Sequence, residues 1–319
     1  MAEIIQRDGT WAFDGSTVRI TPGLHRSVSL FRQTYGEIAV PLEAVAGVVH
    51  APERKRGRLR LRLREGSDPL LQATGGRLPD AADPYRLSVA VDRSGAAEYV
   101  AEEIRHALLL EQIPEEPAGA YLLPGPPVPV SVRSSDGTVS FDGTRIRIDW
   151  SDISDRVKRA TGPRIIGLAD LARVEWLPGS GSEDGFLRFV THGSVFSGLP
   201  PEKDPFALDL WGNARRDLLT GLVATAVTAR LPHPSTAPVG TGGYAPDTPD
   251  TPDTPDAPVT PVALPAVPRD SVPPVPARAP EDLHDVLLRR LRELGELHRD
   301  GVLTDEEFAM TKAAVLRDF

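Results

Sequence analysis

The feature that most constrains this chain is an internal duplication. Residues 8–20, Asp-Gly-Thr-Trp-Ala-Phe-Asp-Gly-Ser-Thr-Val-Arg-Ile, return at 136–148 as Asp-Gly-Thr-Val-Ser-Phe-Asp-Gly-Thr-Arg-Ile-Arg-Ile. Two later blocks recur in the same order, with 41–48 matching 167–174 and the Leu-Pro and Asp-Pro-aromatic pieces of 78–85 matching those of 199–206. Collinear matches over roughly a hundred residues indicate tandem domains. Features kept in both copies belong to the fold, and features of one copy are candidates for a specific task.

Composition narrows the class of protein. At 319 residues the chain has room for two or three domains, and each copy is long enough for its own core. A net charge of -9 argues against a surface that seeks nucleic acid everywhere. With no cysteine there is no disulfide, thiolate nucleophile or cysteine-based zinc site. The first eight residues lack the apolar run of a signal peptide, and the longest apolar stretch, 218–227, is too short for a bilayer. We expect a cytoplasmic protein.

Within each copy, short strands come first and one helix comes last. Alternating or β-branched segments predict strands at 18–20, 37–40, 45–49, 59–63 and 87–91 in the first copy, and at 174–176, 186–190 and 206–210 in the second. A helix is expected from Ser94 to about Gln112, with one apolar face made by Ala97, Val100, Ile104 and Leu108. The second copy is expected to end in a helix from Asn213 to Arg230.

This order of elements predicts an α+β fold, in which a bent antiparallel sheet is closed by a C-terminal helix. A pleckstrin-homology-like barrel is the closest match, and we expect the two copies to superpose. The predicted domains are repeat 1 at 1–114, a Pro-rich connector at 115–130, repeat 2 at 131–232, a linker at 233–281 and a helical hairpin at 282–319.

The linker and the hairpin differ sharply in composition. The linker carries fourteen prolines in the 48 residues from 233 to 280, including Pro-Asp-Thr repeats at 246–256, and it cannot bury enough apolar surface to order itself. The hairpin has an apolar stripe and a capping box at 304–307. So short a hairpin is expected to need another surface for its apolar face, which comprises Leu287, Leu291, Leu294 and Phe308.

Two family resemblances follow from these motifs. Residues 294–308, with Gly-Val-Leu-Thr-Asp-Glu-Glu-Phe at 301–308, resemble the SHOCT domain, a short C-terminal module of bacterial and phage proteins. The tandem copies, with Phe-Asp-Gly twice and Leu-Pro followed by Asp-Pro twice, resemble the actinobacterial family called domain of unknown function 4429. The resemblance to SHOCT implies oligomerisation or attachment to partners. Neither resemblance implies an established reaction or a catalytic residue.

One strongly basic segment has no counterpart in the second copy. Strand alternation places Arg58, Arg60, Arg62 and Arg64 on one face and leucines on the other, and repeat 2 keeps one arginine there. Either the segment is the solvated face of a half-buried strand, or it binds an anionic ligand. An anionic membrane gives about 1 kcal/mol per basic residue. The candidate stripe comprises Arg54, Lys55, Arg56, Arg58, Arg60, Arg62 and Arg64. It lacks the interleaved aromatic residues of single-strand binders, so nucleic acid is an unlikely partner.

Other chemistry-bearing residues favour a structural interpretation. Asp-Gly and Asp-Pro are turn formers, and Asp83-Pro84 and Asp204-Pro205 are placed to deliver Tyr85 and Phe206 into strands. The Gly-rich segment 179–185 matches no phosphate-binding loop and is expected to be a hairpin loop. The seven histidines are scattered without metal-ligand spacing, and the four tryptophans suit a core or an interface. We expect no catalytic residue, no cofactor and no metal.

The sequence therefore favours a non-catalytic adaptor or assembly protein. Two binding domains form a head, and a tethered hairpin associates with itself or docks on another protein. A first alternative is a module at the membrane periphery that binds anionic lipid through the repeat-1 arginines. A second alternative is an enzyme with an unrecognised site, for which a deep polar pocket shared by both repeats is expected.

Overall fold

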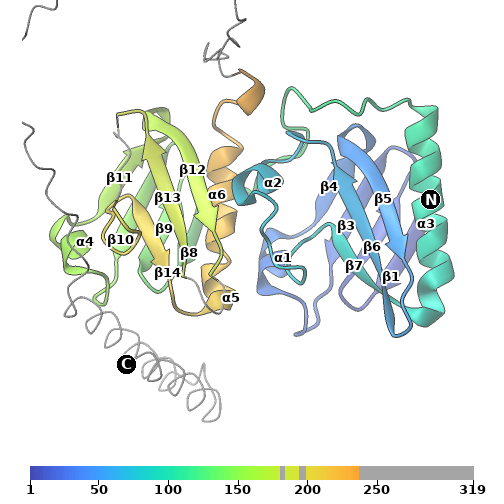
Figure 1. Ribbon diagram of the computed structural model, residues 1–319, viewed down its shortest axis with the longest axis horizontal. Helices are drawn as coiled ribbons and strands as arrows, with labels where there is room; N and C mark the ends of the chain where they lie inside the picture. The colour runs from blue at the N-terminus through green and yellow to red at the C-terminus, as the bar shows by residue number, and fades with distance from the viewer. Residues whose placement is uncertain (180–183, 194–198, 237–319) are drawn as a thin grey trace, which may run out of the picture.

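Two similar sheet-rich repeats lie side by side in the computed structural model, which describes residues 1–179, 184–193 and 199–236 (Figure 1). All strand pairs are antiparallel, and each repeat contains a four-stranded and a three-stranded sheet in its described residues. The α+β class is thereby confirmed. The predicted hairpin, with Leu287, Leu291, Leu294 and Phe308, lies outside the described residues, as does most of the predicted linker.

Repeat 1 is built from seven strands and three helices. Its first sheet has the order β1 (Ala2–Gln6), β2 (Gly9–Phe13), β3 (Thr17–Pro22) and β4 (Ile38–Pro41), with α1 (Leu30–Tyr35) between β3 and β4. A 3₁₀ turn, Leu42–Ala44, leads into the second sheet, which comprises β5 (Val45–Ala51), β6 (Arg56–Leu63) and β7 (Arg86–Ala90). The helix α2 (Pro69–Thr74) lies between β6 and β7, and a 3₁₀ turn, Val91–Arg93, precedes α3 (Ser94–Leu110).

Repeat 2 follows the same plan. Its first sheet has the order β8 (Val130–Arg133), β9 (Gly137–Phe141), β10 (Arg145–Trp150) and β11 (Arg164–Gly167), with α4 (Arg156–Ala160) before β11. After a 3₁₀ turn, Leu168–Asp170, the second sheet comprises β12 (Leu171–Leu177), β13 (Gly185–Thr191) and β14 (Ala207–Leu210). Two helices follow, α5 (Ala214–Asp217) and α6 (Thr220–Thr228), and a last 3₁₀ turn at Pro234–Thr236.

The cores are formed by every second residue of the strands, because the side chains of a strand alternate between its two faces. In repeat 1, Ile4 on β1 pairs with Trp11 on β2, Trp11 with Ile20 on β3, and all three side chains are buried. The equivalent row in repeat 2 is Val132, Val139 and Ile148, also buried. Each large side chain removed from water stabilises the fold by roughly 1.5–3 kcal/mol. The strands that the sequence predicted at 18–20 and 45–49 lie within β3 and β5, and the strand predicted at 37–40 overlaps β4 except at residue 37.

The C-terminal helices close the two repeats in the same way, but their surroundings differ. The helix α3 contacts β1 and β5, and α6 contacts the corresponding strands β8 and β12. In α3 the predicted face is buried at Ala97, Val100 and Ile104, whereas Tyr99 and Leu109 on the other side are exposed. In α6 every residue is buried. Because α6 is buried on all sides, another element besides the strands of its own repeat must cover it.

The helix predicted from Asn213 to Arg230 is interrupted. Asn213 caps α5 by accepting hydrogen bonds from the backbone N–H groups of Arg215 and Arg216. Between α5 and α6 the backbone changes to i→i−3 bonds, Leu219 N to Arg216 O and Gly221 N to Leu218 O. Tighter turns of this kind are common at helix ends, and here they separate one predicted helix into two.

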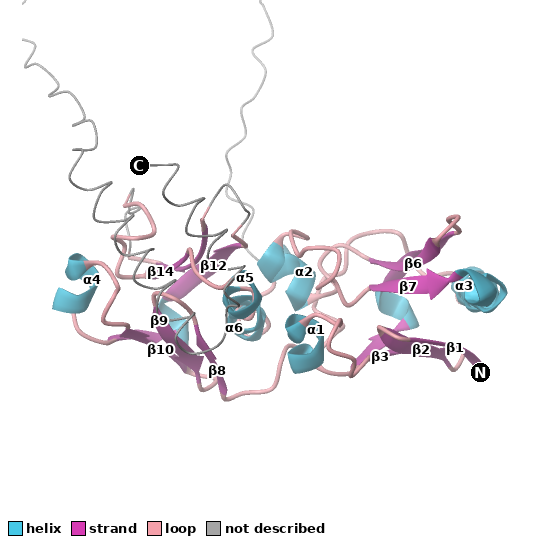
Figure 2. Ribbon diagram, turned by 90° about the horizontal axis from the view of Figure 1, so that it is seen from below, coloured by secondary structure: helices cyan, strands magenta, loops and turns pink. Residues whose placement is uncertain are grey.

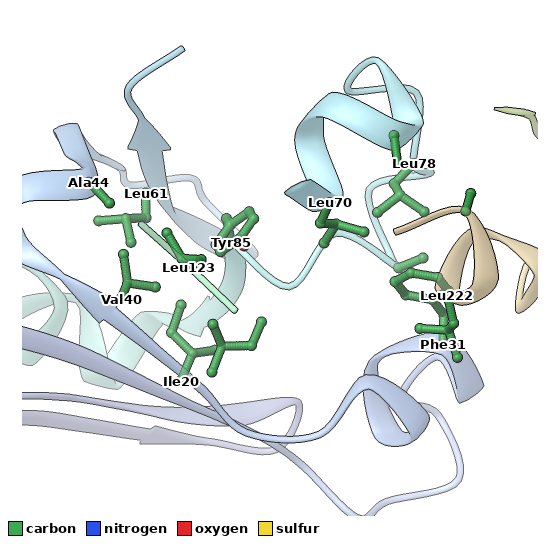
Figure 3. Close-up of a cluster of buried hydrophobic side chains, with 14 of the residues drawn as sticks. Ile20, Phe31, Val40, Ala44, Leu61, Leu70, Leu78, Tyr85, Leu123 and Leu222 are labelled. Atoms are coloured by element: carbon green, nitrogen blue, oxygen red, sulfur yellow. The ribbon is translucent and has the colours of Figure 1, made fainter. Parts of the chain in front are cut away.

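The second neighbour of α6 is α2, which projects from repeat 1. Figure 3 shows Leu70 and Leu78 of repeat 1 above Phe31 and Leu222, where Leu222 belongs to α6. These apolar side chains are buried, and α2 also contacts β12. Gly221 permits the close approach, since a Cβ atom added there would lie only 3.2 Å from Phe31 Cε2. Figure 2 shows α1 and α2 facing α5 and α6 between the two repeats, so apolar packing joins them into one head.

The connector takes part in this packing. Leu123 is buried beside Val40, Leu61 and Tyr85 in the core of repeat 1 (Figure 3), and its backbone N–H donates to the carbonyl of Ser67. The last described residues, assigned to the linker from the sequence, also lie against repeat 1. His233 Nε2 lies 2.9 Å from the carbonyl oxygen of Gly66, and the Ser235 hydroxyl donates to the carbonyl of Gly119. The described chain therefore ends beside the segment that follows β6.

Candidate functional site

The basic segment of repeat 1 forms the outer face of β6. Leu59 and Leu61 point into the core and are buried, whereas the intervening Arg58, Arg60 and Arg62 are exposed, as strand alternation predicts. Arg56 continues the outer face, and Arg54 and Lys55 are exposed in the turn before it. We call Arg56, Arg58, Arg60 and Arg62 the basic row.

Two arginines of the predicted stripe have partners in the fold. Arg58 donates to Glu53, and its guanidinium also lies 3.9 Å from Asp80. Arg64 is half-buried and donates to the backbone carbonyls of Glu43 and Glu116, so it ties the connector to repeat 1. Arg64 therefore has a structural role that the sequence pattern did not predict.

The other members of the stripe are free of such contacts. Within the described part of the chain, the side chains of Arg54, Lys55, Arg56, Arg60 and Arg62 have no ion pair or hydrogen bond. Opposite Arg60 and Arg62 on β5 stand Val49, which is 47% exposed, and Gly47. Arg60 and Arg62 are exposed, and together with Arg56 they give this sheet face positive charge that no described residue neutralises.

The equivalent face of repeat 2 is neutralised. Arg188 on β13 is only 15% exposed and is paired with Asp204 and Glu175 at 2.9 and 3.8 Å. Arg173 donates to the same Glu175. On β13 the remaining outward positions are Phe186 and Val190, where the basic row has arginines. The free positive charge therefore belongs to repeat 1 and is not required by the fold.

A different charged pair is common to both repeats. In repeat 2, Asp136 and Lys158 form an ion pair at 0% exposure, and Asp136 Oδ2 accepts the backbone N–H of Asp209 at 2.9 Å. In repeat 1, Asp8 Oδ2 lies 3.7 Å from Arg32 and accepts the N–H of Ser88 at 3.0 Å. Each aspartate joins the first sheet to the last strand of the second sheet and to a short helix. The sequence contained a signal for this pair, namely the duplicated Asp-Gly with a basic residue in each following helix.

The repeated Asp-Pro pieces are structural, as predicted. Asp83 Oδ1 accepts the N–H of Tyr85 at 2.9 Å, and Asp204 Oδ1 accepts that of Phe206 at 2.8 Å. These side-chain turns lead directly into β7 and β14. Asp14 and Asp142, the aspartates of the two Phe-Asp-Gly motifs, form the same kind of turn, where each accepts backbone N–H groups from residues two and three positions later.

Two buried carboxyl groups have raised pKa values. Burial raises the pKa of Asp68 to about 6, although the carboxylate accepts hydrogen bonds from Leu70 N, Leu71 N and the Tyr85 hydroxyl. Burial likewise raises the pKa of Asp217 to about 6, against hydrogen bonds from Ser135 and Gly212. Raised values can mark acid–base catalysts. Here Asp68 caps α2 and Asp217 joins α5 to the turn before β9, so both are explained by structure.

Two grooves are the remaining candidate sites among the described residues. A groove of about 760 Å³ lies between the turn at 15–17 and the connector, with Glu43, Arg64 and Glu111 as its charged lining residues. A second groove, of about 400 Å³, lies over the first sheet of repeat 2 and is lined by different residues, including Arg145 and Arg147. Among the described residues, no three His, Asp or Glu side chains are grouped as metal ligands, and no helix is long and apolar enough to cross a bilayer.

A comparison with models of known protein families shows the family to which this chain belongs. The model described as "Domain of unknown function (DUF4429)" matches residues 11–105 and 139–228, which together exceed half of the chain. The chain belongs to the DUF4429 family. The two matched regions coincide with the two structural repeats, so each repeat is one DUF4429 domain, and the basic row lies inside the first. A search of curated proteins finds no match. The two DUF4429 domains thus resemble each other in their interiors, and the basic row is a surface feature that distinguishes the first domain from the second.

Proposed function

We propose that this DUF4429 protein is a non-catalytic adaptor or assembly protein. The observation that carries the proposal is the packing of α2 of the first domain on α6 of the second, which joins two domains into one head. A fixed head holds the outer faces of both domains at a constant separation, as a scaffold for partners requires. The linker then attaches this head to the C-terminal segment.

The proposal also includes a fold for each domain and for the C-terminal segment. Each domain is pleckstrin-homology-like, which is supported by seven strands in two antiparallel sheets followed by a closing helix. The C-terminal residues 282–319 form a SHOCT-like hairpin, which is supported by the motif at 301–308. Through its apolar face the hairpin binds a second copy of itself or another protein.

Light scattering of the full chain tests the adaptor proposal. We expect a mass above that of a monomer, and a monomer after Leu291→Asp with Leu294→Asp, with the melting of the head unchanged. Arg289→Ala with Arg292→Ala is the matched control, because it changes the net charge equally on the opposite face of the expected helix. If the full chain stays monomeric at high concentration, the hairpin does not bind itself, and only binding to another protein is left of the proposal. Dissociation by the control variant would contradict the assigned face.

The free arginines favour a second candidate function, binding to an anionic membrane surface at the periphery. At about 1 kcal/mol per basic residue, the five basic side chains that have no partner among the described residues correspond to a dissociation constant on the order of 0.1 mM for one head. Such binding is weak. Association of several heads through their tails multiplies it, because linked sites bind at high effective concentration.

Vesicle co-sedimentation of the full chain tests this second function. Binding to vesicles of phosphatidylserine and phosphatidylcholine should weaken as salt rises from 0.05 to 0.5 M, roughly as charge screening demands. Vesicles of phosphatidylcholine alone serve as the control. Equal binding to both vesicle types would contradict an electrostatic membrane contact.

A further inference from the structure

We propose that the acidic segment at 246–256 of this same chain docks on the basic row of repeat 1. The segment reads Pro-Asp-Thr-Pro-Asp-Thr-Pro-Asp-Thr-Pro-Asp and carries four aspartates without a basic residue. The docking surface consists of the basic row with Arg54 and Lys55, of which five side chains lack a partner within the described residues. This inference requires neither self-association of the tail nor binding to a membrane.

The place where the described chain ends supports this occupant. His233 and Ser235 lie against Gly66 and Gly119, next to the residues that follow β6. The chain therefore leaves the head at the end of the strand that carries the basic row. Gly66 and Arg56 are ten positions apart, so they are separated by at most about 33 Å at the rise of a strand.

The length of the intervening chain fits this distance. Asp247 lies eleven residues along the chain from Thr236, with ten residues between them. In an extended Pro-rich conformation this stretch reaches about 34 Å. The first aspartate can thus reach any point of the basic row, and the other three follow within the next nine residues.

The spacing of the charges is also compatible. Aspartates recur at every third residue, and a polyproline II segment has three residues per turn, so they share one face at intervals of about 9 Å. Arginines on one face of a strand recur at about 7 Å. Both rows are linear, of opposite sign and of similar length, about 28 Å against about 20 Å.

Covalent attachment compensates for the weakness of each contact. Exposed ion pairs contribute little individually and are screened by salt. A segment tethered by a short linker is nevertheless present at an effective concentration in the millimolar range. The docked segment also competes with any external anion for the same arginines, so it makes the basic row selective for ligands that outcompete it.

Zero-length cross-linking of the full chain tests the docking. Lys55 stands at the start of the basic row, and a carbodiimide couples its amine to a carboxylate in direct contact. We expect mass spectrometry to find Lys55 joined to the peptide that contains Asp247, Asp250, Asp253 and Asp256, with loss of this product in 0.5 M salt. Absence of the product at low salt, or its persistence at high salt, overturns the proposal.

Two controls separate the alternatives. Arg60→Glu with Arg62→Glu retains Lys55 and should abolish the product, whereas Arg145→Glu with Arg147→Glu, the same change on β10, should retain it. Equal yields in the two variants overturn the assignment to the basic row. Mixing ¹⁵N-labelled with unlabelled chains should give products of one isotope only, since mixed products would mean that a second copy supplies the acidic segment.

Discussion

Repeat 1 and repeat 2 share an aspartate–cation pair but differ on the outer face of the second sheet. The pairs Asp8–Arg32 and Asp136–Lys158 occupy the same point of the two domains. On the outer faces, by contrast, Arg60 and Arg62 have no partner in the described residues of repeat 1, whereas Arg188 of repeat 2 is paired with Asp204. Duplication thus separates the requirements of the fold from the features of a single copy.

A second difference between the repeats concerns the closing helices. The helix α3 keeps an exposed side, but α6 is enclosed by its own sheets and by α2 of the first domain (Figure 1). The apolar character of residues 218–227 therefore reflects a contact between domains. Repeat 1 contributes the accessible charge, and repeat 2 contributes the helix on which the head is assembled.

The largest predicted effect concerns the shared pair. Asp136→Ala leaves Lys158 buried without its counter-charge and should lower the free energy of unfolding by about 3–5 kcal/mol. Asp8→Ala should cost less, because Asp8 is 25% exposed and lies farther from its partner. Urea denaturation of both variants checks this order. Equal losses, or a loss below about 1 kcal/mol for Asp136→Ala, would show that the pair does not anchor repeat 2.

The second-largest predicted effect on stability concerns the contact between the two domains. Leu70→Ala opens a cavity between α2 and α6 and should destabilise the chain by about 2–4 kcal/mol. It should also separate the unfolding of the two domains into two calorimetric transitions. Leu109→Ala on α3, where the side chain is 77% exposed, is the matched control and should change stability by less than about 0.5 kcal/mol. A single transition in Leu70→Ala argues against α2 as the coupling element.

A pH effect of intermediate size is expected at Asp68. Its pKa is raised from 3.8 to about 6 in the folded chain, so the folded state holds a proton that the unfolded state has already lost between these values. The stability present below pH 4 is therefore lost as pH rises through 6, by about 1–3 kcal/mol. Asp68→Asn cannot ionise, and its stability relative to the parent chain should rise over this window. A constant difference between pH 4 and 7 would contradict the raised pKa.

The smallest stability effect is expected on the basic row. Arg60→Glu with Arg62→Glu alters exposed side chains that have no partner in the described structure, and it should change the free energy of unfolding by less than about 0.5 kcal/mol. Thermal melting checks this. A large loss would assign these arginines to the fold and remove the contrast with repeat 2.

Sequence reasoning found the features that depend on local pattern. Strand alternation predicted the exposed side of β6, and the turn chemistry of Asp83 and Asp204 predicted where β7 and β14 begin. It missed α1, α2 and α4, because helices of five or six residues are too short to show a 3.6-residue period.

Other features were missed because they are tertiary. The role of Arg64 depends on carbonyl groups of Glu43 and Glu116, which have no signature in side-chain sequence. The packing of Leu70 on α6 joins elements about 150 residues apart, and the apolar run at 218–227 was its one visible trace.

The most direct test of the central claim compares matched charge reversals in anionic-vesicle binding. Arg60→Glu with Arg62→Glu on β6 and Arg145→Glu with Arg147→Glu on β10 change the net charge of the full chain equally, and each pair alternates on an exposed strand face. Loss of two contacts at about 1 kcal/mol each predicts roughly 30-fold weaker binding for the β6 variant, and little change for the β10 variant. Equal weakening of both variants would show that net charge alone governs binding and would contradict a functional surface on repeat 1.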